Sequence, residues 1–412
     1  MSLISSFEAY ANKVFRLDSI LGSLSDERIQ PTIPLHSIVK AVFLASAFRI
    51  KAISGIELEC RLGILKKKIG PMSDDTIGYG LNHLSPDQLR LEMRHLQKVW
   101  KRNGMLRNNP FNDWIVGVLD VIEIGSSYER HCPRCLVRHI NNDGEEVEQY
   151  YHRASVLILV GYEFPIPVDI ELMRPGEDEV RCGLRLLKRV VKQLGVRFIN
   201  AVIGDAFYCK PHFFSECKKL KIAAGAVLKE NQENLLESAE VLKRQSDPIF
   251  TKQNKKGEYE KVWELKDVYW ATADKDVRVI WAERRVLDYV GKGKDKKLEL
   301  VDKKNVFVFS KEMDALPARI VYQISRHRWK IDASFFQDFT RNWHLKHPTL
   351  HFEKALENLL LIKLIAYTIF MFFFFRHINS RRHDKISSFI QMARMLYQSA
   401  CAVWLADTVP RI

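Results

Sequence analysis

The chain has 412 residues, a formal net charge of +14 and 47% hydrophobic residues. This apolar content excludes a disordered chain, and the length predicts two or three domains. The positive balance favours a polyanionic partner, nucleic acid before a membrane surface, although a basic protein without such a partner would have the same total. Seven scattered cysteines and the absence of an apolar leader in MSLISSFEAYANKVFRLD predict a cytoplasmic protein without a disulfide framework.

Residues 1–110 are predicted to form an all-helical, DNA-binding region. LHSIVKAVFLASAFRIKA and DQLRLEMRHLQKVWKRNG carry apolar residues at three- and four-residue spacing. Ser73 and Ser85 are expected to be N-caps, with Pro86 in a first helical position. The basic residues Lys66, Lys67 and Lys68 between short helices indicate a helix-turn-helix-like unit that contacts DNA. The alternative is a helical bundle that only packs on the next domain.

The residue pattern of the sequence changes after the polar segment RNNPFND. Residues 111–228 contain β-branched runs that first follow one another and then alternate with amphipathic helical segments, which predicts an α/β layer with a mixed sheet. Residues 229–317 are strand-like and rich in lysine, and we interpret them as a β-rich insertion. Residues 318–412 are predicted to be helical again.

The most apolar segment, LLLIKLIAYTIFMFFFF, covers residues 359–375. Its 17 residues are marginally short for a bilayer, and it contains Lys363 and Tyr367. We expect a buried core helix and no membrane association. The alternative is a membrane-associated protein anchored by this segment.

Two acids follow apolar runs that are typical of buried strands. Asp120 follows residues 115–119 and Asp205 follows residues 202–204. An acid at the carboxyl end of a buried strand lies at the rim of the sheet, where open α/β folds place their ligands. Two such carboxylates can share a hard divalent cation, although acids at strand ends also cap turns without any catalytic role.

Five segments in order resemble one known family. LDVIEIGSSYERHCPRC, YYHRASVLIL, MRPGEDEV, VIGDAFY and HRWKIDASFF are similar to segments of the DDE transposases of bacterial insertion sequences, in the group with a β-insertion before the third acid. The resemblance implies an RNase H-like mixed-sheet core that is completed by the C-terminal helices. It also implies cleavage and strand transfer at transposon ends by chemistry that uses two Mg²⁺ (or Mn²⁺) ions.

The resemblance assigns the metal-binding and catalytic roles to Asp120, Asp205 and Asp332. It implies double-stranded DNA as the partner, both terminal inverted repeats and target, bound by a homodimer associated with the nucleoid. Arg326, Arg328 and Lys330 surround the third acid and are expected to contact DNA. Arg328 lies four residues before Asp332, so both side chains fall on one helix face, where an ordinary surface ion pair is the alternative to phosphate binding.

This sequence departs from the family pattern near the third acid. Asp332 stands where relatives carry Glu, Ser325 where they often carry Tyr, Phe339 where they often carry Lys, and Val121 where they often carry Gly. Because the Asp332 side chain is one methylene shorter than that of Glu, the alternative is a catalytically decayed derivative that only binds DNA. Trp329 is expected to pack its helix on the sheet. Trp343 and His344 are candidates for the border of a DNA channel.

The segment HCPRC contains Cys132 and Cys135 at the spacing of half a zinc site. No second pair follows at the expected spacing, and His139 or His152 would complete a site only through a particular fold. The sequence therefore favours a tight turn or buried thiols over zinc.

Overall fold

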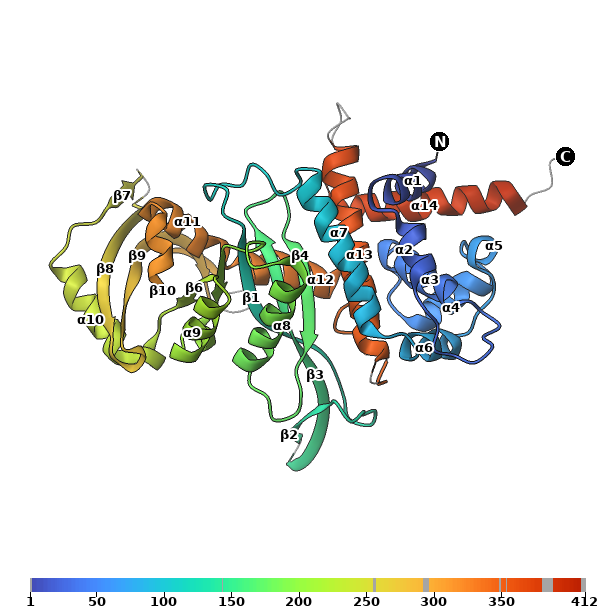
Figure 1. Ribbon diagram of the computed structural model, residues 1–412, viewed down its shortest axis with the longest axis horizontal. Coiled ribbons are helices and arrows are strands. Elements are labelled where there is room, and N and C mark those ends of the chain that lie inside the picture. Colours follow the sequence, from blue (N-terminus) through green and yellow to red (C-terminus); the bar gives the residue numbers. More distant parts are fainter. Residues whose placement is uncertain are drawn as a thin grey trace.

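A computed structural model describes residues 2–142, 144–254, 257–291, 296–347, 350–352, 354–379 and 388–408. Helices from both ends of the chain lie together at one end of the elongated molecule (Figure 1). A sheet begins beside them and continues to the opposite end. The predicted α/β class with a mixed sheet is confirmed.

The described residues before the sheet form helices separated by turns. Ser73 caps α6, and its side chain accepts a hydrogen bond from the N–H of Thr76, as predicted. Ser85 and Pro86 begin α7, although Ser85 makes no side-chain capping bond. The helices are α1 (Leu3–Phe15), α2 (Leu17–Ser23), α3 (Leu35–Ala47), α4 (Ile53–Arg61), α5 (Lys66–Ile69), α6 (Asp74–Asn82) and α7 (Pro86–Arg102).

The first half of the sheet combines antiparallel and parallel pairs. β1 (Val116–Ser127) pairs antiparallel with β3 (Glu145–Val160), which also pairs with β2 (Leu136–Asn142) and β4 (Ile166–Leu172). On its other side β1 pairs parallel with β5 (Ala201–Gly204), and β5 pairs parallel with β6 (Ala223–Val227). The intervening helices α8 (Glu179–Leu194) and α9 (Pro211–Lys219) connect β4 to β5 and β5 to β6.

The strands of residues 229–317 extend the same sheet, because β10 pairs antiparallel with β6. These strands are β7 (Phe250–Gln253), β8 (Tyr259–Trp270), β9 (Lys275–Val290) and β10 (Lys297–Phe309), in the spatial order β10, β9, β8, β7. The segment begins with the helix α10 (Glu233–Arg244), where a purely strand-like pattern was expected. The apolar positions of α10 pack on β8, so this helix covers one face of the extension.

Helices follow the last strand, as predicted. They are α11 (Ala318–His327), the π-helix η6 (Ile331–Phe336), α12 (Gln337–Arg341), α13 (Ala355–Phe372), the π-helix η7 (Phe373–Ile378) and α14 (Phe389–Thr408). The helical stretch Ala355–Ile378 is long and apolar enough to cross a membrane, but 94% of its most apolar window is buried inside the protein. The predicted buried core helix is therefore confirmed, and α3, α6, α7 and β4 pack around it.

A buried polar network fastens the helices to the sheet. Asp169 and Glu171 lie on β4, all of whose residues are buried. Arg189 on α8 bonds both carboxylates. Arg90 on α7 lies 3.6 Å from Asp169 and bonds Glu357 on α13. Because buried charges are tolerated only when they are paired, this network fixes how α7, α8 and α13 lie on the sheet.

Candidate functional site

The structure brings Asp120 and Asp205 to the same level of the sheet. Val118 of β1 is the partner of Ile203 in the parallel ladder. Asp120 lies two residues after Val118, and Asp205 lies two residues after Ile203. The two acids therefore occupy equivalent positions along the neighbouring strands. Because strand side chains repeat every two residues, both carboxylates leave the sheet on one face.

The turn after β5 fixes the position of Asp205. The Oδ1 atom of Asp205 accepts a hydrogen bond of 2.9 Å from the N–H of Phe207 and caps the short helix η1 (Ala206–Tyr208). The ring of Tyr208 folds back on Gly204, where a Cβ atom would lie 2.5 Å from it. Glycine is therefore required immediately before this acid, and the prediction that Asp205 ends a buried strand is confirmed.

Asp120 does not end its strand, and this prediction was wrong. β1 continues to Ser127 in its antiparallel pairing with β3, and Asp120 lies opposite Val156. The parallel ladder with β5, however, ends at Val118. The apolar run stops because β1 leaves the parallel part of the sheet there, and Asp120 lies at the rim of that part.

Arg328 links Asp332 to one of the two strand acids, Asp120. Nη1 of Arg328 lies 3.4 Å from a carboxylate oxygen of Asp120 and 3.3 Å from one of Asp332. The Arg328 side chain is only 5% exposed, whereas that of Asp332 is 43% exposed. The predicted four-residue pairing is therefore present, on a backbone that passes from α11 into the π-helix η6. Single π-helical turns are frequent at functional sites.

The three carboxylates influence one another electrostatically. Burial, together with the charges of Asp332 and Asp205, raises the pKa of Asp120 to about 7, although Arg328 opposes the rise. Burial also raises the pKa of Asp332 above its ordinary value, with the Arg328 charge opposing it and the Asp205 charge adding to it. An acid whose pKa is raised toward neutrality by burial and by neighbouring acids is typical of functional sites.

The donor set of this acid cluster (Asp120, Asp205 and Asp332) fits a hard divalent cation. Carboxylate oxygens are the ligands that Mg²⁺ and Mn²⁺ prefer. A cation between the carboxylates would remove the repulsion that raises the pKa of Asp120. In the described part of the chain the aspartates do not form a group with all ligand atoms within 4.8 Å, so a shared ion requires their side chains to move closer.

A basic groove with a volume of about 610 Å³ begins beside the acid cluster. The exposed Trp329 lines it, and the guanidinium of Arg328 lies 4.3 Å from the centre of that indole ring. The cationic and aromatic residues that line the groove are Arg284, Lys303, Lys304, Phe307, Tyr322, Arg326 and Trp329. Cations beside an exposed aromatic ring, here Trp329, suit a nucleic-acid strand. Sequence reasoning missed Arg284, Lys303 and Lys304, although their segment was noted as rich in lysine.

The aromatic residues near the third acid differ from expectation. Trp329 is 50% exposed, so the prediction that it packs on the sheet was wrong. Trp343 is buried against Phe339 and Tyr367 and carries the guanidinium of Arg49 on its face, so it is not at the border of a DNA channel. The Nε2 atom of His344 bonds the carbonyl of Arg49, which places this histidine in the same packed region.

The other predicted DNA contacts are dispersed. Arg326 is exposed in the groove and pairs with Glu260. Lys330 is partly buried and lines a different pocket, together with Gln337 and Tyr367. Lys66, Lys67 and Lys68 are exposed on α5, toward the opposite end of the molecule from α11 (Figure 1). The structure therefore does not bring the lysine run and the acid cluster together.

A second group of metal-ligand side chains lies outside the acid cluster. Ligand atoms of Cys132, Cys135 and His152 all lie within 4.8 Å of one another. The sequence favoured a tight turn or buried thiols, with His152 able to complete a site only through a particular fold, and the β2–β3 hairpin brings His152 to the cysteine pair. His139 is exposed and lies near Glu146 instead.

Comparisons with known proteins add no family assignment. No protein-family model matches the chain, and no curated protein matches it significantly.

Proposed function

We propose that this protein is a metal-dependent transposase of the DDE type, which cleaves DNA at transposon ends and transfers the freed strand to a target. The order of the core strands supports the RNase H-like part of this proposal. Three antiparallel strands (β4, β3 and β1) are followed by two strands parallel to β1, with helices in the connections. This is the arrangement expected of an RNase H-like core.

The observation that carries the proposal is the convergence of the three aspartates. They come from β1, from the end of β5 and from a helix more than a hundred residues later, yet Asp120 is influenced by both of the others. Bound between such carboxylates, a pair of Mg²⁺ ions supplies an activated attacking oxygen and a stabilised leaving oxygen. Asp120 and Asp205 would hold the ions from the sheet, and Asp332 from the helical side.

Arg328 has a positioning role in this proposal. Its guanidinium lies between the carboxylates of Asp120 and Asp332. With cations bound, the same guanidinium is placed to contact a DNA phosphate, because guanidinium groups bind phosphates in a forked geometry. The neighbouring basic groove would hold the DNA strand against the site. Double-stranded DNA, a homodimer on paired ends and a nucleoid-associated cytoplasmic location belong to the same proposal.

The test is Mg²⁺-dependent cleavage of DNA that carries the inverted repeats flanking the gene. We expect cleavage by the full chain, and a loss of at least about a hundredfold in Asp120→Ala and Asp205→Ala because each removes a carboxylate from the proposed metal site. Asp247→Ala is the control, because Asp247 is exposed and outside the cluster. Cleavage that is unchanged in Asp120→Ala would contradict the proposal.

A DNA-binding protein without catalysis is the second candidate, and the position of Asp332 favours it. Asp332 is one methylene shorter than the Glu of relatives, and the three acids do not meet within 4.8 Å in the described residues. Asp332→Glu separates the candidates. A decayed enzyme gains cleavage in this variant, whereas an active enzyme cleaves without it.

A further inference from the structure

The turn that contains Cys132 and Cys135 directs both sulfur atoms to one point. This turn connects β1 and β2, and the N–H of Cys135 donates to the carbonyl of Cys132 at 2.9 Å. The N–H of Cys132 donates to Sγ of Cys135 at 3.2 Å. Burial raises the pKa of the Cys135 thiol to about 11, and this backbone donor opposes the rise by stabilising the thiolate, the form that binds metals.

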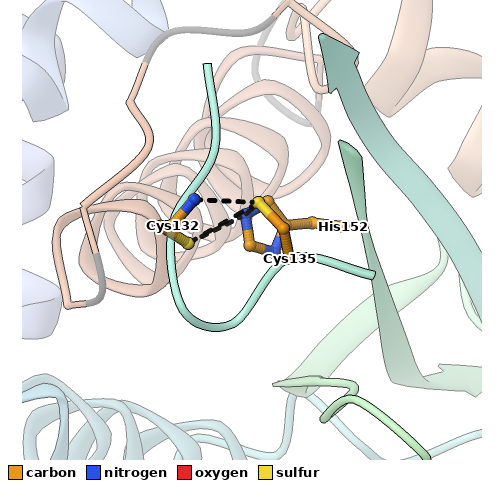
Figure 2. A group of neighbouring side chains, drawn as sticks. All are labelled: Cys132, Cys135 and His152. Atoms are coloured by element: carbon orange, nitrogen blue, oxygen red, sulfur yellow. Dashed lines mark hydrogen bonds between the residues drawn. The ribbon is translucent and has the colours of Figure 1, made fainter. Parts of the chain in front are cut away.

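His152 of β3 completes a compact three-residue group with these thiols (Figure 2). The two Sγ atoms lie 3.7 Å apart. Nε2 of His152 lies 3.5 Å from Sγ of Cys132 and 3.3 Å from Sγ of Cys135. Cys135 and His152 are buried. The three ligand atoms therefore face a common centre that is shielded from solvent on most sides.

These distances match those around a tetrahedral zinc ion. Zinc bonds of about 2.3 Å to sulfur and about 2.0–2.1 Å to nitrogen place two sulfur ligands roughly 3.8 Å apart, and sulfur and nitrogen ligands roughly 3.5 Å apart. The observed separations differ from these values by about 0.2 Å or less. Two thiolates and an imidazole select zinc over the hard Mg²⁺ or Mn²⁺ of the acid cluster.

Among the described residues, His351 is a candidate for a fourth ligand. Its Nδ1 atom lies 3.9 Å from Sγ of Cys135, and its ring centre lies 6.0 Å from that of His152. His351 lies just before α13, and Arg134, within the cysteine turn, pairs with Glu357 on the first turn of that helix. The turn is therefore already held against the start of α13, where a small movement of His351 would close the coordination.

We propose that Cys132, Cys135 and His152 bind a zinc ion, with His351 as the fourth ligand. Two cysteines and two histidines form a closed structural site, which leaves no position for a substrate. The ion joins the β1–β2 turn, β3 and the segment before α13, which are far apart in sequence. Its role is to hold the β2–β3 hairpin on the C-terminal helices, independently of the chemistry at the aspartates.

Metal analysis of the full chain, purified without chelators or added metal, tests the proposal. We expect about one zinc per chain, and less than about a tenth of it in Cys132→Ser and His152→Ala. Two variants serve as matched controls and should keep the metal: Cys401→Ser, which removes a partly buried thiol elsewhere, and His139→Ala, which removes the exposed histidine of the same hairpin. His351→Ala should weaken zinc retention against a chelator without abolishing binding.

Cobalt substitution of the unaltered protein keeps the test decisive where a variant does not fold. Co²⁺ in the proposed site gives visible d–d bands of tetrahedral intensity and a thiolate charge-transfer band in the near ultraviolet, and one equivalent of Zn²⁺ removes both. Zinc below about a tenth of an equivalent, together with no such Co²⁺ spectrum, would overturn the proposal. A Cys132–Cys135 disulfide in protein purified under reducing conditions, or equal zinc loss in His139→Ala, would overturn it as well.

Discussion

Asp120 occupies an environment that opposes its own charge. Its side chain is 12% exposed, and its partners include two further acids. The positive charge of Arg328 offsets only part of the unfavourable burial of the Asp120 carboxylate, because the same Nη1 atom also pairs with Asp332. Buried acids that lie close to one another lower the stability of a fold, and functional sites commonly carry this cost.

Asp120→Asn should therefore stabilise the metal-free protein above neutral pH. The pKa of Asp120 is about 7 in the folded state, against an ordinary value near 3.9. The folded state thus binds more protons between roughly pH 4 and pH 7, so stability falls as the pH rises through this window. We expect the variant to be more stable by up to ~4 kcal/mol at pH 8 and nearly equal to the parent at pH 4.

Chemical denaturation at both pH values, with a chelator present, measures this difference. Asp247→Asn is the control, because an exposed acid outside the cluster should give no pH-dependent difference. Added Mg²⁺ should stabilise the parent chain and narrow the gap to Asp120→Asn. A gap that is the same at pH 4 and pH 8 would contradict the electrostatic explanation.

At the scale of elements, the strands and helices with clear periodicity were predictable, whereas the contacts between them were not. The β-branched runs of β3 and β4 and the amphipathic α8 lie where the pattern placed them. The placement of Asp120 at a strand end was wrong, because the second half of β1 is only partly buried and pairs with β3 alone. Likewise, no local signal marks His152 as a neighbour of Cys135, since the hairpin that joins them is set by long-range pairing.

Arg90 shows how one such interaction holds elements together. It is 5% exposed, and it bonds the carbonyl of Ile170 at 3.2 Å as well as the carboxylate of Glu357. Arg90→Ala would remove a positive charge that neutralises the buried carboxylates of Glu357 and Asp169. We expect a loss of roughly 3–5 kcal/mol in the free energy of unfolding, measured by denaturant titration.

Arg102→Ala on the same helix is the matched control. Arg102 is exposed at the end of α7, so its removal should change stability by less than about 0.5 kcal/mol. Equal effects of the two substitutions would show that the buried network does not fasten α7 to the sheet.

For the whole molecule, the positive charge was predictable from composition but its distribution was not. Residues 229–317 were interpreted as a β-rich insertion, and the pairing of β10 with β6 makes their strands part of the central sheet. Lys303 and Lys304 on β10 thereby reach the same groove as Arg326 on α11 and Trp329 just after it. The lysine run of α5 lies toward the other end. The molecule thus presents two separate basic surfaces, of which one adjoins the acid cluster.

Removing the cations of these two surfaces should affect DNA binding and DNA cleavage differently. The triple variant Lys303→Ala, Lys304→Ala and Arg326→Ala removes three cations from the groove, so the log–log slope of DNA affinity against salt should become shallower by about 0.9 for each phosphate that is no longer neutralised. Because this groove adjoins Arg328 through Trp329, cleavage should also fall at saturating DNA. The matched triple variant at Lys66, Lys67 and Lys68 removes the same charge far from the acids, so it should lower affinity while leaving cleavage of bound DNA unchanged. Salt-dependent binding isotherms and single-turnover cleavage distinguish the two surfaces, and a lysine-run variant that alone stops cleavage would place the DNA path on the helical end instead.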